Sequence, residues 1–160
     1  MKFLRLKQPL FIILIILISC LNQKEKRDYS HEFRQIKERF NLSFYHEDSF
    51  LILIPLNGCS DCIQTALNFI QNNKEIMNVI CIISDIGTKR VDSYLKDTLE
   101  SGLRIIPDYS AVVYRFEPYL NSPVIYHVKN SKYYNRKLLD SQNAPELLLE
   151  ILAQGKHKHE

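Results

Sequence analysis

The chain has 160 residues, 46% of them hydrophobic and 24% charged, with four cysteines and no tryptophan. This length allows one globular domain and not two, and the apolar fraction excludes wholesale disorder, because unfolded chains lack the residues that bury a core. The formal net charge of +3 equals the three basic residues of positions 1–19, a stretch without acids. The rest of the chain is therefore formally neutral, without the basic excess that a nucleic-acid partner favours.

The first 20 residues have the order of a bacterial lipoprotein signal. A cationic segment, 1–8, precedes an unbroken apolar run of nine residues, 10–18. Such a run has the length of a signal-peptide core and about half of what a membrane-spanning helix needs. It ends in Leu17-Ile18-Ser19-Cys20, which resembles the lipobox: apolar, apolar, small, Cys. The resemblance implies cleavage before Cys20 and a diacylglyceryl group on its sulfur.

We therefore expect a signal peptide over 1–19, a lipidated Cys20 with a polar tether over 20–30, and a globular domain over 31–160. Several acyl chains hold a protein to a bilayer far more firmly than one does. The mature chain should then be anchored to a membrane of the bacterial cell envelope and face outside the cytoplasm. Which membrane and which face stay open, and the alternative is an uncleaved N-terminal anchor with an incidental cysteine.

The spacing of apolar residues divides the domain into helices and strands. In chain order it predicts a helix over 30–40, a strand over 50–56, a helix over 60–72, a strand over 79–84, a helix over 88–101 and a strand over 103–106. The segment 109–116 is ambiguous, with helix favoured over strand. A hairpin of strands 124–129 and 132–135 follows, and then a closing helix that Asn143 can cap. This order predicts a compact α/β domain of three layers, with an antiparallel edge on its sheet.

Cys59 and Cys62 lie where the predicted strand 50–56 turns into the predicted helix 60–72. The first cysteine is at the helix N-terminus, where unpaired backbone N–H groups and the helix dipole favour a thiolate. The second lies one turn further along the same face, so the two sulfurs can close a small ring. A Cys59 thiolate can attack a substrate disulfide, and Cys62 can resolve the mixed disulfide. The pair therefore predicts thiol–disulfide exchange, with Cys59 as nucleophile and Cys62 as resolving cysteine.

Asp61 stands between the two sulfurs, where a carboxylate should oppose thiolate formation at Cys59, so we expect a relatively reducing couple. The alternatives are an inert disulfide, unused thiols or a metal half-site. A structural zinc site takes four ligands, and the chain has neither a second Cys-x-x-Cys nor a His-x-x-x-His. We therefore assign no metal site, and we expect Cys81 to be a small buried hydrophobe.

The segment FLILIPLNGCSDCIQTALNFI, a following βα unit, a strand beginning Ser122-Pro123, a KNSK turn and the closing helix resemble the thioredoxin fold over residues 50–154. Pro123 follows Cys62 by 61 positions, a spacing similar to that of the subgroup with an extra βα insertion. That subgroup contains membrane-anchored thioredoxin-like proteins of the cytochrome-maturation type. The resemblance implies a three-layer α/β sandwich, with a central mixed sheet and helices on both faces. It also implies a cis Ser122–Pro123 bond beside the sulfurs, with the Ser122 backbone pairing with an extended substrate segment.

The chain departs from that family by lacking a tryptophan before Cys59, a proline between the cysteines and a clear equivalent of the buried acid that assists the resolving cysteine. Two function classes follow. One is a thiol–disulfide oxidoreductase without an organic cofactor, which needs protein thiol or disulfide substrates and a redox partner. The other is a thioredoxin-fold binding or scaffolding lipoprotein whose dithiol is not turned over. A trans Ser122–Pro123 bond, or one far from Cys59, would count against the enzyme. A copper-delivery domain would need His127 close to the sulfurs, whereas a satisfied strand histidine is expected there.

Overall fold

The computed structural model describes residues 27–156, apart from residues 74, 97–102 and 119. The predicted signal peptide, Cys20 and most of the predicted tether lie outside the described residues. Within the described part of the chain, no helix is both long enough and apolar enough to cross a membrane.

The helices and strands follow the apolar patterns of the sequence. In chain order they are α2 (Ser30–Arg39), β1 (Asp48–Pro55), α3 (Ser60–Asn72), β2 (Val79–Ser84), α4 (Thr88–Lys96), β3 (Arg104–Asp108), α5 (Val113–Phe116), β4 (Val124–Lys129), β5 (Lys132–Leu138) and α6 (Ala144–Lys156). The ambiguous segment contains the short helix α5, as favoured. β5 is longer than predicted, because it pairs with β4 as far as Leu138, opposite Val124.

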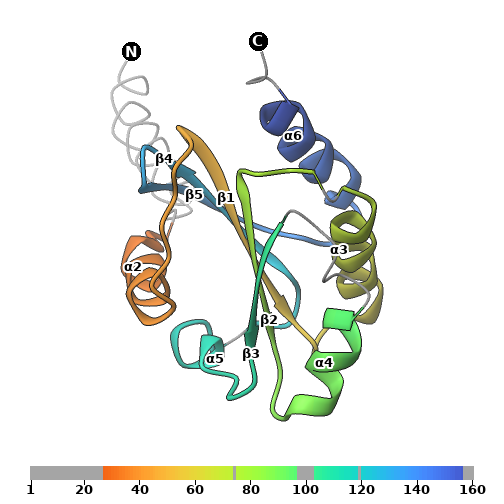
Figure 1. Cartoon of the computed structure of the whole chain (residues 1–160). Helices are drawn as coiled ribbons and strands as arrows, with labels where there is room; N and C mark the ends of the chain where they lie inside the picture. Colours follow the sequence, from red (N-terminus) through yellow and green to blue (C-terminus); the bar gives the residue numbers. More distant parts are fainter. Residues whose placement is uncertain (1–26, 74, 97–102, 119, 157–160) are drawn as a thin grey trace, which may run out of the picture.

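The five strands form one mixed sheet in the order β3-β2-β1-β4-β5. β1, β2 and β3 are parallel, β4 is antiparallel to β1, and β5 is antiparallel to β4. Helices α3, α4 and α6 cover one face of the sheet, and α2 and α5 cover the other (Figure 1). Two parallel βα units followed by a hairpin and a closing helix, with the cysteine pair directly after β1, make this a thioredoxin-like fold. The predicted three-layer α/β architecture is confirmed.

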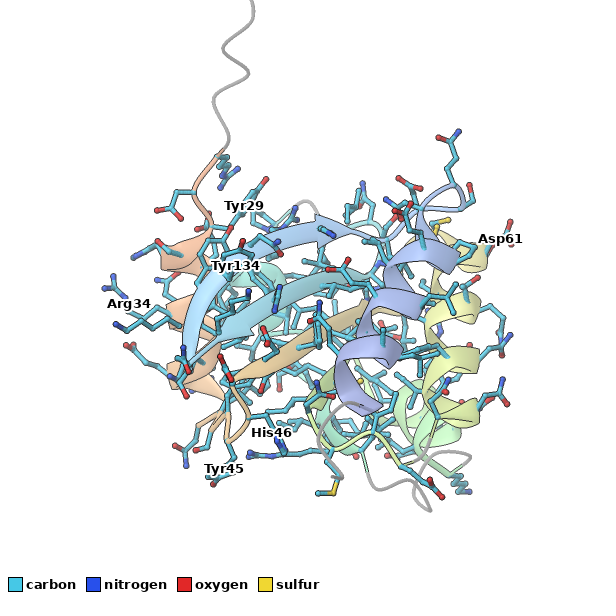
Figure 2. All side chains as sticks on the ribbon, turned by 90° about the horizontal axis from the view of Figure 1, so that it is seen from above. Tyr29, Arg34, Tyr45, His46, Asp61 and Tyr134 are labelled. Atoms are coloured by element: carbon cyan, nitrogen blue, oxygen red, sulfur yellow. The ribbon has the colours of Figure 1, made fainter. Side chains whose placement is uncertain are left out.

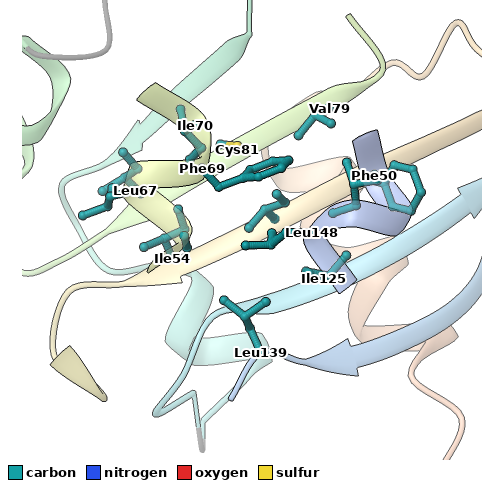
Figure 3. Close-up of a cluster of buried hydrophobic side chains, with 14 of the residues drawn as sticks. Phe50, Ile54, Leu67, Phe69, Ile70, Val79, Cys81, Ile125, Leu139 and Leu148 are labelled. Carbon is teal, nitrogen blue, oxygen red and sulfur yellow. The ribbon is translucent and has the colours of Figure 1, made fainter. Parts of the chain in front are cut away.

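β1 is apolar from Phe50 to Pro55 because each of its faces contacts a separate core. Successive strand residues point to opposite faces. Phe50, Ile52 and Ile54 pack toward α3 and α6, in the core shown in Figure 3. Leu51 and Leu53 pack on the opposite face, in the core that α2 also contributes to. Full burial of each such side chain contributes about 1.5–3 kcal/mol, so β1 is the central support of the domain.

The sheet register decides which loops meet. Because β1 and β2 are parallel, the segments that follow Pro55 and Ser84 leave the sheet at the same edge. β4 runs the other way and begins at Val124 opposite Leu53, so the loop before β4 arrives at that edge too. The cysteine turn and the Asn121–Pro123 loop are therefore neighbours, although about sixty residues separate them in the chain.

Candidate active site

Cys59 is the N-cap residue of α3, with φ −60° and ψ 109°. Its carbonyl accepts a hydrogen bond of 2.9 Å from the Ile63 N–H, which closes the first turn of the helix. The Cys59 side chain is exposed, whereas Cys62, one turn later, is only 3% exposed. Both thiols are free. One sulfur is thus open to a partner molecule and the other is shielded from it, as the predicted roles require.

The two thiols have pKa values shifted in opposite directions. The pKa of Cys59 lies below its ordinary value, first because the Cys62 thiol hydrogen-bonds to its sulfur and then because the Cys62 backbone N–H does. Burial raises the pKa of Cys62, and the neighbouring Cys59 raises it further. Cys59 is therefore the thiol that ionises first, as a nucleophile must.

Asp61 has two opposite effects on Cys59. Its carboxylate raises the pKa of Cys59, as expected, but this is the smallest of the effects, and its own backbone N–H lowers that pKa. Asp61 is exposed at the start of α3, on the side of the molecule opposite Arg34 of α2 (Figure 2). The helix terminus and Cys62 therefore outweigh the carboxylate, and the expected opposition is present but minor.

Gly58 allows the cysteine turn to dock on the Asn121 backbone. A Cβ atom at position 58 would lie 2.1 Å from the Asn121 carbonyl oxygen and 2.6 Å from its carbon, closer than side-chain atoms approach. The next residue, Cys59, donates its backbone N–H to the same oxygen at 2.7 Å. Glycine is needed here for close approach, and the docking fixes the start of α3 against the loop before β4.

The Ser122–Pro123 bond is trans, and the prediction of a cis bond is wrong. An X–Pro bond prefers trans by about 0.5–1 kcal/mol unless tertiary contacts hold it cis. Here the loop already meets the cysteine turn through the Asn121 carbonyl. The predicted proximity holds nevertheless, because the Ser122 side chain hydrogen-bonds to Cys62 and lowers the pKa of that thiol. Pro123 is buried.

Asp140 is a residue near the thiols that sequence reasoning missed. Its negative charge raises the pKa of Cys62. Its carboxylate accepts hydrogen bonds from the backbone N–H groups of Gln142 and Asn143, at 2.9 and 2.8 Å. Asp140 thus holds the start of α6, while Asn143, the expected cap, turns its side chain back toward Leu138 and Asp140. Nothing in the local pattern around Asp140 indicates that it lies near a cysteine 78 positions earlier.

An open depression of about 520 Å³ lies beside the cysteine turn. It is lined by Asn57, which directly precedes Gly58, and by the segment 85–90 that leads from β2 into α4. Ile86 in that segment is 80% exposed. Cys59 is two residues beyond Asn57 in the chain and does not itself line the depression.

His127 and Cys81 lie away from this site. His127 is opposite Phe50, near the start of β1, whereas Cys59 follows the end of β1. Its Nε2 atom is 2.9 Å from Asp48 Oδ1 and its ring stacks on Phe50, so it is the satisfied strand histidine that was expected. His127 is therefore not close to the sulfurs of Cys59 and Cys62, as a copper-delivery domain would require. Cys81 is fully buried, and burial raises its pKa far above that of an ordinary thiol.

The described residues contain no cluster of three or more His, Cys, Asp or Glu side chains placed to hold a metal ion.

No family model matches the chain, and no curated protein matches it significantly. Solved structures give distant likenesses. A protein provisionally assigned as thiol:disulfide interchange protein DsbE from Chlorobium tepidum is 17% identical, with a TM-score of 0.48, over 67% of this chain and 79% of that one. A thioredoxin-like protein in the oxidized form is 9% identical, with a TM-score of 0.46, over 68% of this chain and 80% of that one. A peroxiredoxin-like protein from Aquifex aeolicus is 8% identical, with a TM-score of 0.41, over 68% of this chain and 75% of that one. The strand order and the direction of each strand, rather than these distant likenesses, identify the fold as thioredoxin-like.

Proposed function

We propose that this chain is a thiol–disulfide oxidoreductase that acts on protein disulfides outside the cytoplasm. The observation that carries the proposal is the contrast between the two cysteines. Cys59 is exposed at the N-terminus of α3 with a lowered pKa, and Cys62 is buried one turn later with a raised pKa. A structural pair of thiols needs no such difference in exposure and acidity.

The exchange proceeds in two steps. The Cys59 thiolate attacks one sulfur of a substrate disulfide, forming a mixed disulfide and releasing the other substrate sulfur as a thiolate. Cys62 then loses its proton and attacks the Cys59 sulfur, which forms the Cys59–Cys62 disulfide and releases the second substrate thiol. The substrate gains two electrons and the protein loses two. A dithiol redox partner must return these electrons, and no organic cofactor is required.

The surroundings of the thiols support a reducing direction and a polypeptide substrate. The charges of Asp61 and Asp140 oppose the thiolates of Cys59 and Cys62 respectively, although the hydrogen bonds from Cys62 lower the pKa of Cys59 overall. A strong oxidant has a stabilised reduced form, which these carboxylates oppose. The open depression beside Asn57 supports an extended chain as substrate, and we propose that the backbone of Ser122 pairs with it. Lipidation of Cys20 would hold the domain at the membrane of the cell envelope.

A second candidate is a binding or scaffolding lipoprotein whose dithiol is not turned over. The trans Ser122–Pro123 bond favours it, because the resemblance to exchange enzymes implies a cis bond at this place. The two candidates differ in what happens to the cysteines. An exchange enzyme passes reversibly between dithiol and disulfide, whereas a binding protein keeps one state.

The reduction potential of the Cys59–Cys62 pair separates them. The full chain, held in a mild detergent, is equilibrated in glutathione and dithiothreitol buffers and the oxidised fraction is read by mass spectrometry, with Cys59→Ser as the control. A reversible two-electron couple nearer to about −270 mV, as in thioredoxin, than to about −120 mV, as in strong periplasmic oxidants, supports the reducing enzyme. A couple near the upper value overturns the direction. Failure to form the disulfide, or a disulfide that resists every buffer, favours the binding protein.

A further inference from the structure

We propose that Arg90 is a positioning residue for Cys59: its guanidinium, reaching across from α4, holds the two residues that precede Gly58 and so fixes the place of the nucleophile. The inference rests on the proposed exchange at Cys59. Arg90 has no role in the sequence pattern of the site, because it belongs to the next βα unit.

The Arg90 guanidinium contacts three acceptors, which belong to the residues directly after β1 and β2. Its Nη1 donates to Asn57 Oδ1 at 3.0 Å and lies 3.4 Å from Asp85 Oδ2. Its Nη2 donates to the backbone carbonyl of Leu56. The planar fork of arginine can serve several acceptors at fixed angles, which the ammonium of a lysine cannot do.

Asp85 is a buried and well-anchored partner for the Arg90 guanidinium. The residue is only 4% exposed, and its Oδ1 accepts the Ile86 N–H at 2.7 Å. Its own N–H donates to the Asp108 carbonyl at 3.2 Å, which ties it to the end of β3. The Asp85 carboxylate is therefore held in place at the end of β2. Through its contact with Asp85, Arg90 restrains the cysteine turn.

The turn is consequently held from two sides. On the α4 side Arg90 bonds Leu56 and Asn57. On the β4 side the Asn121 carbonyl accepts the Cys59 N–H. Between these two attachments lies only Gly58, the residue with the greatest backbone freedom. Loss of Arg90 removes the contacts to the Asn57 side chain and the Leu56 carbonyl and leaves Leu56 held by its N–H on the Ser84 carbonyl at 2.9 Å. The two residues before Gly58 are then less restrained, so the Cys59 sulfur spends less time at the helix N-terminus and against the Cys62 thiol.

The test compares Arg90→Met with Arg104→Met, a matched loss of one guanidinium. Arg104 is exposed at the start of β3, whereas the cysteine turn follows the end of β1, so the two lie at opposite ends of the parallel strands. The full chain in detergent is alkylated with iodoacetamide in short pulses across a pH series, and the modified Cys59 peptide is counted by mass spectrometry. R90M should lower the Cys59 rate at pH 7 by about threefold to tenfold and move its midpoint to higher pH, as loss of one or two hydrogen bonds predicts. R104M should match the wild type.

Two further variants test the mechanism. Arg90→Lys keeps the charge without the fork, so it should recover less than half of the lost rate; full recovery would overturn the positioning role in favour of simple charge. Asn57→Ala removes an acceptor without touching α4, and it should slow Cys59 by itself but add little to R90M. This variant also serves as the test should R90M not fold.

Equal Cys59 rates in R90M and R104M would overturn the inference. Its failure is distinguishable from failure of the proposed function, because alkylation needs no turnover. A chain that never cycles between dithiol and disulfide, yet whose Cys59 reactivity depends on Arg90, refutes the enzyme and supports the positioning role. A chain that cycles between dithiol and disulfide, yet whose Cys59 rate is equal in R90M and R104M, refutes the positioning role alone.

Discussion

Gly58→Ala tests whether the cysteine turn docks on the Asn121 backbone in solution. The added methyl group would lie 2.1 Å from the Asn121 carbonyl oxygen, and its nearest neighbours are all backbone atoms that no side-chain rotation can move. The turn must then shift away, which breaks the 2.7 Å hydrogen bond from the Cys59 N–H to that oxygen.

The expected cost follows from these two effects. Forcing an extra methyl into a packed site costs about 1–3 kcal/mol. Loss of the hydrogen bond costs about 0.5–1.5 kcal/mol. Together they lower the free energy of unfolding by about 1.5–4.5 kcal/mol, a large share of the 5–15 kcal/mol that is typical of a domain. The Cys59 alkylation rate should fall as well, because the sulfur moves with the turn.

Urea unfolding of the full chain in detergent, followed by circular dichroism, measures the first effect, and pulsed alkylation of Cys59 measures the second. Gly87→Ala is the control: a Cβ there has nothing within 4 Å, but its φ of +109° makes alanine strained. G87A should cost about 1–3 kcal/mol through backbone strain without a clash at Asn121, so it calibrates the stability lost to strain alone. A G58A chain within about 0.5 kcal/mol of the wild type, with normal Cys59 reactivity, would refute the docking.

Three other predictions concern the ionisation of the two thiols and the buried ion pair of Glu117 and Arg136. Because only the thiolate is alkylated, Cys59 should react with a midpoint below about pH 8.5, the ordinary thiol value, and Cys62 with a midpoint above it; the reverse order would exchange their roles. Asp140→Asn removes a charge that raises the pKa of Cys62, so the Cys62 midpoint should move to lower pH, and an unchanged midpoint would place the carboxylate elsewhere. Arg136→Met leaves the buried Glu117 without its bidentate partner at 2.9 and 3.2 Å, and urea unfolding should show a loss of about 3–5 kcal/mol; a loss below about 1 kcal/mol would contradict a buried ion pair.

Elements and roles with a local signal were predictable from the sequence. The run FLILIPL is apolar throughout because β1 is covered on both faces, and that pattern exists only in the order of its residues. The position of the two cysteines one turn apart on the same face of α3 follows from a spacing of three at a helix start. Their difference in exposure came from the structure. The α/β class and the strand and helix order follow from the same periodicities.

The tertiary structure decided what depends on distant segments meeting. Asn121 excludes any side chain at Gly58, Asp140 brings a carboxylate to Cys62, and Arg90 holds the turn before Cys59. No local pattern signals these contacts, because each depends on the sheet register that brings separate loops to one edge. The trans Ser122–Pro123 bond belongs with them. The two proline isomers differ by about 1 kcal/mol or less in the free chain, so the surrounding contacts select between them and the dipeptide sequence does not.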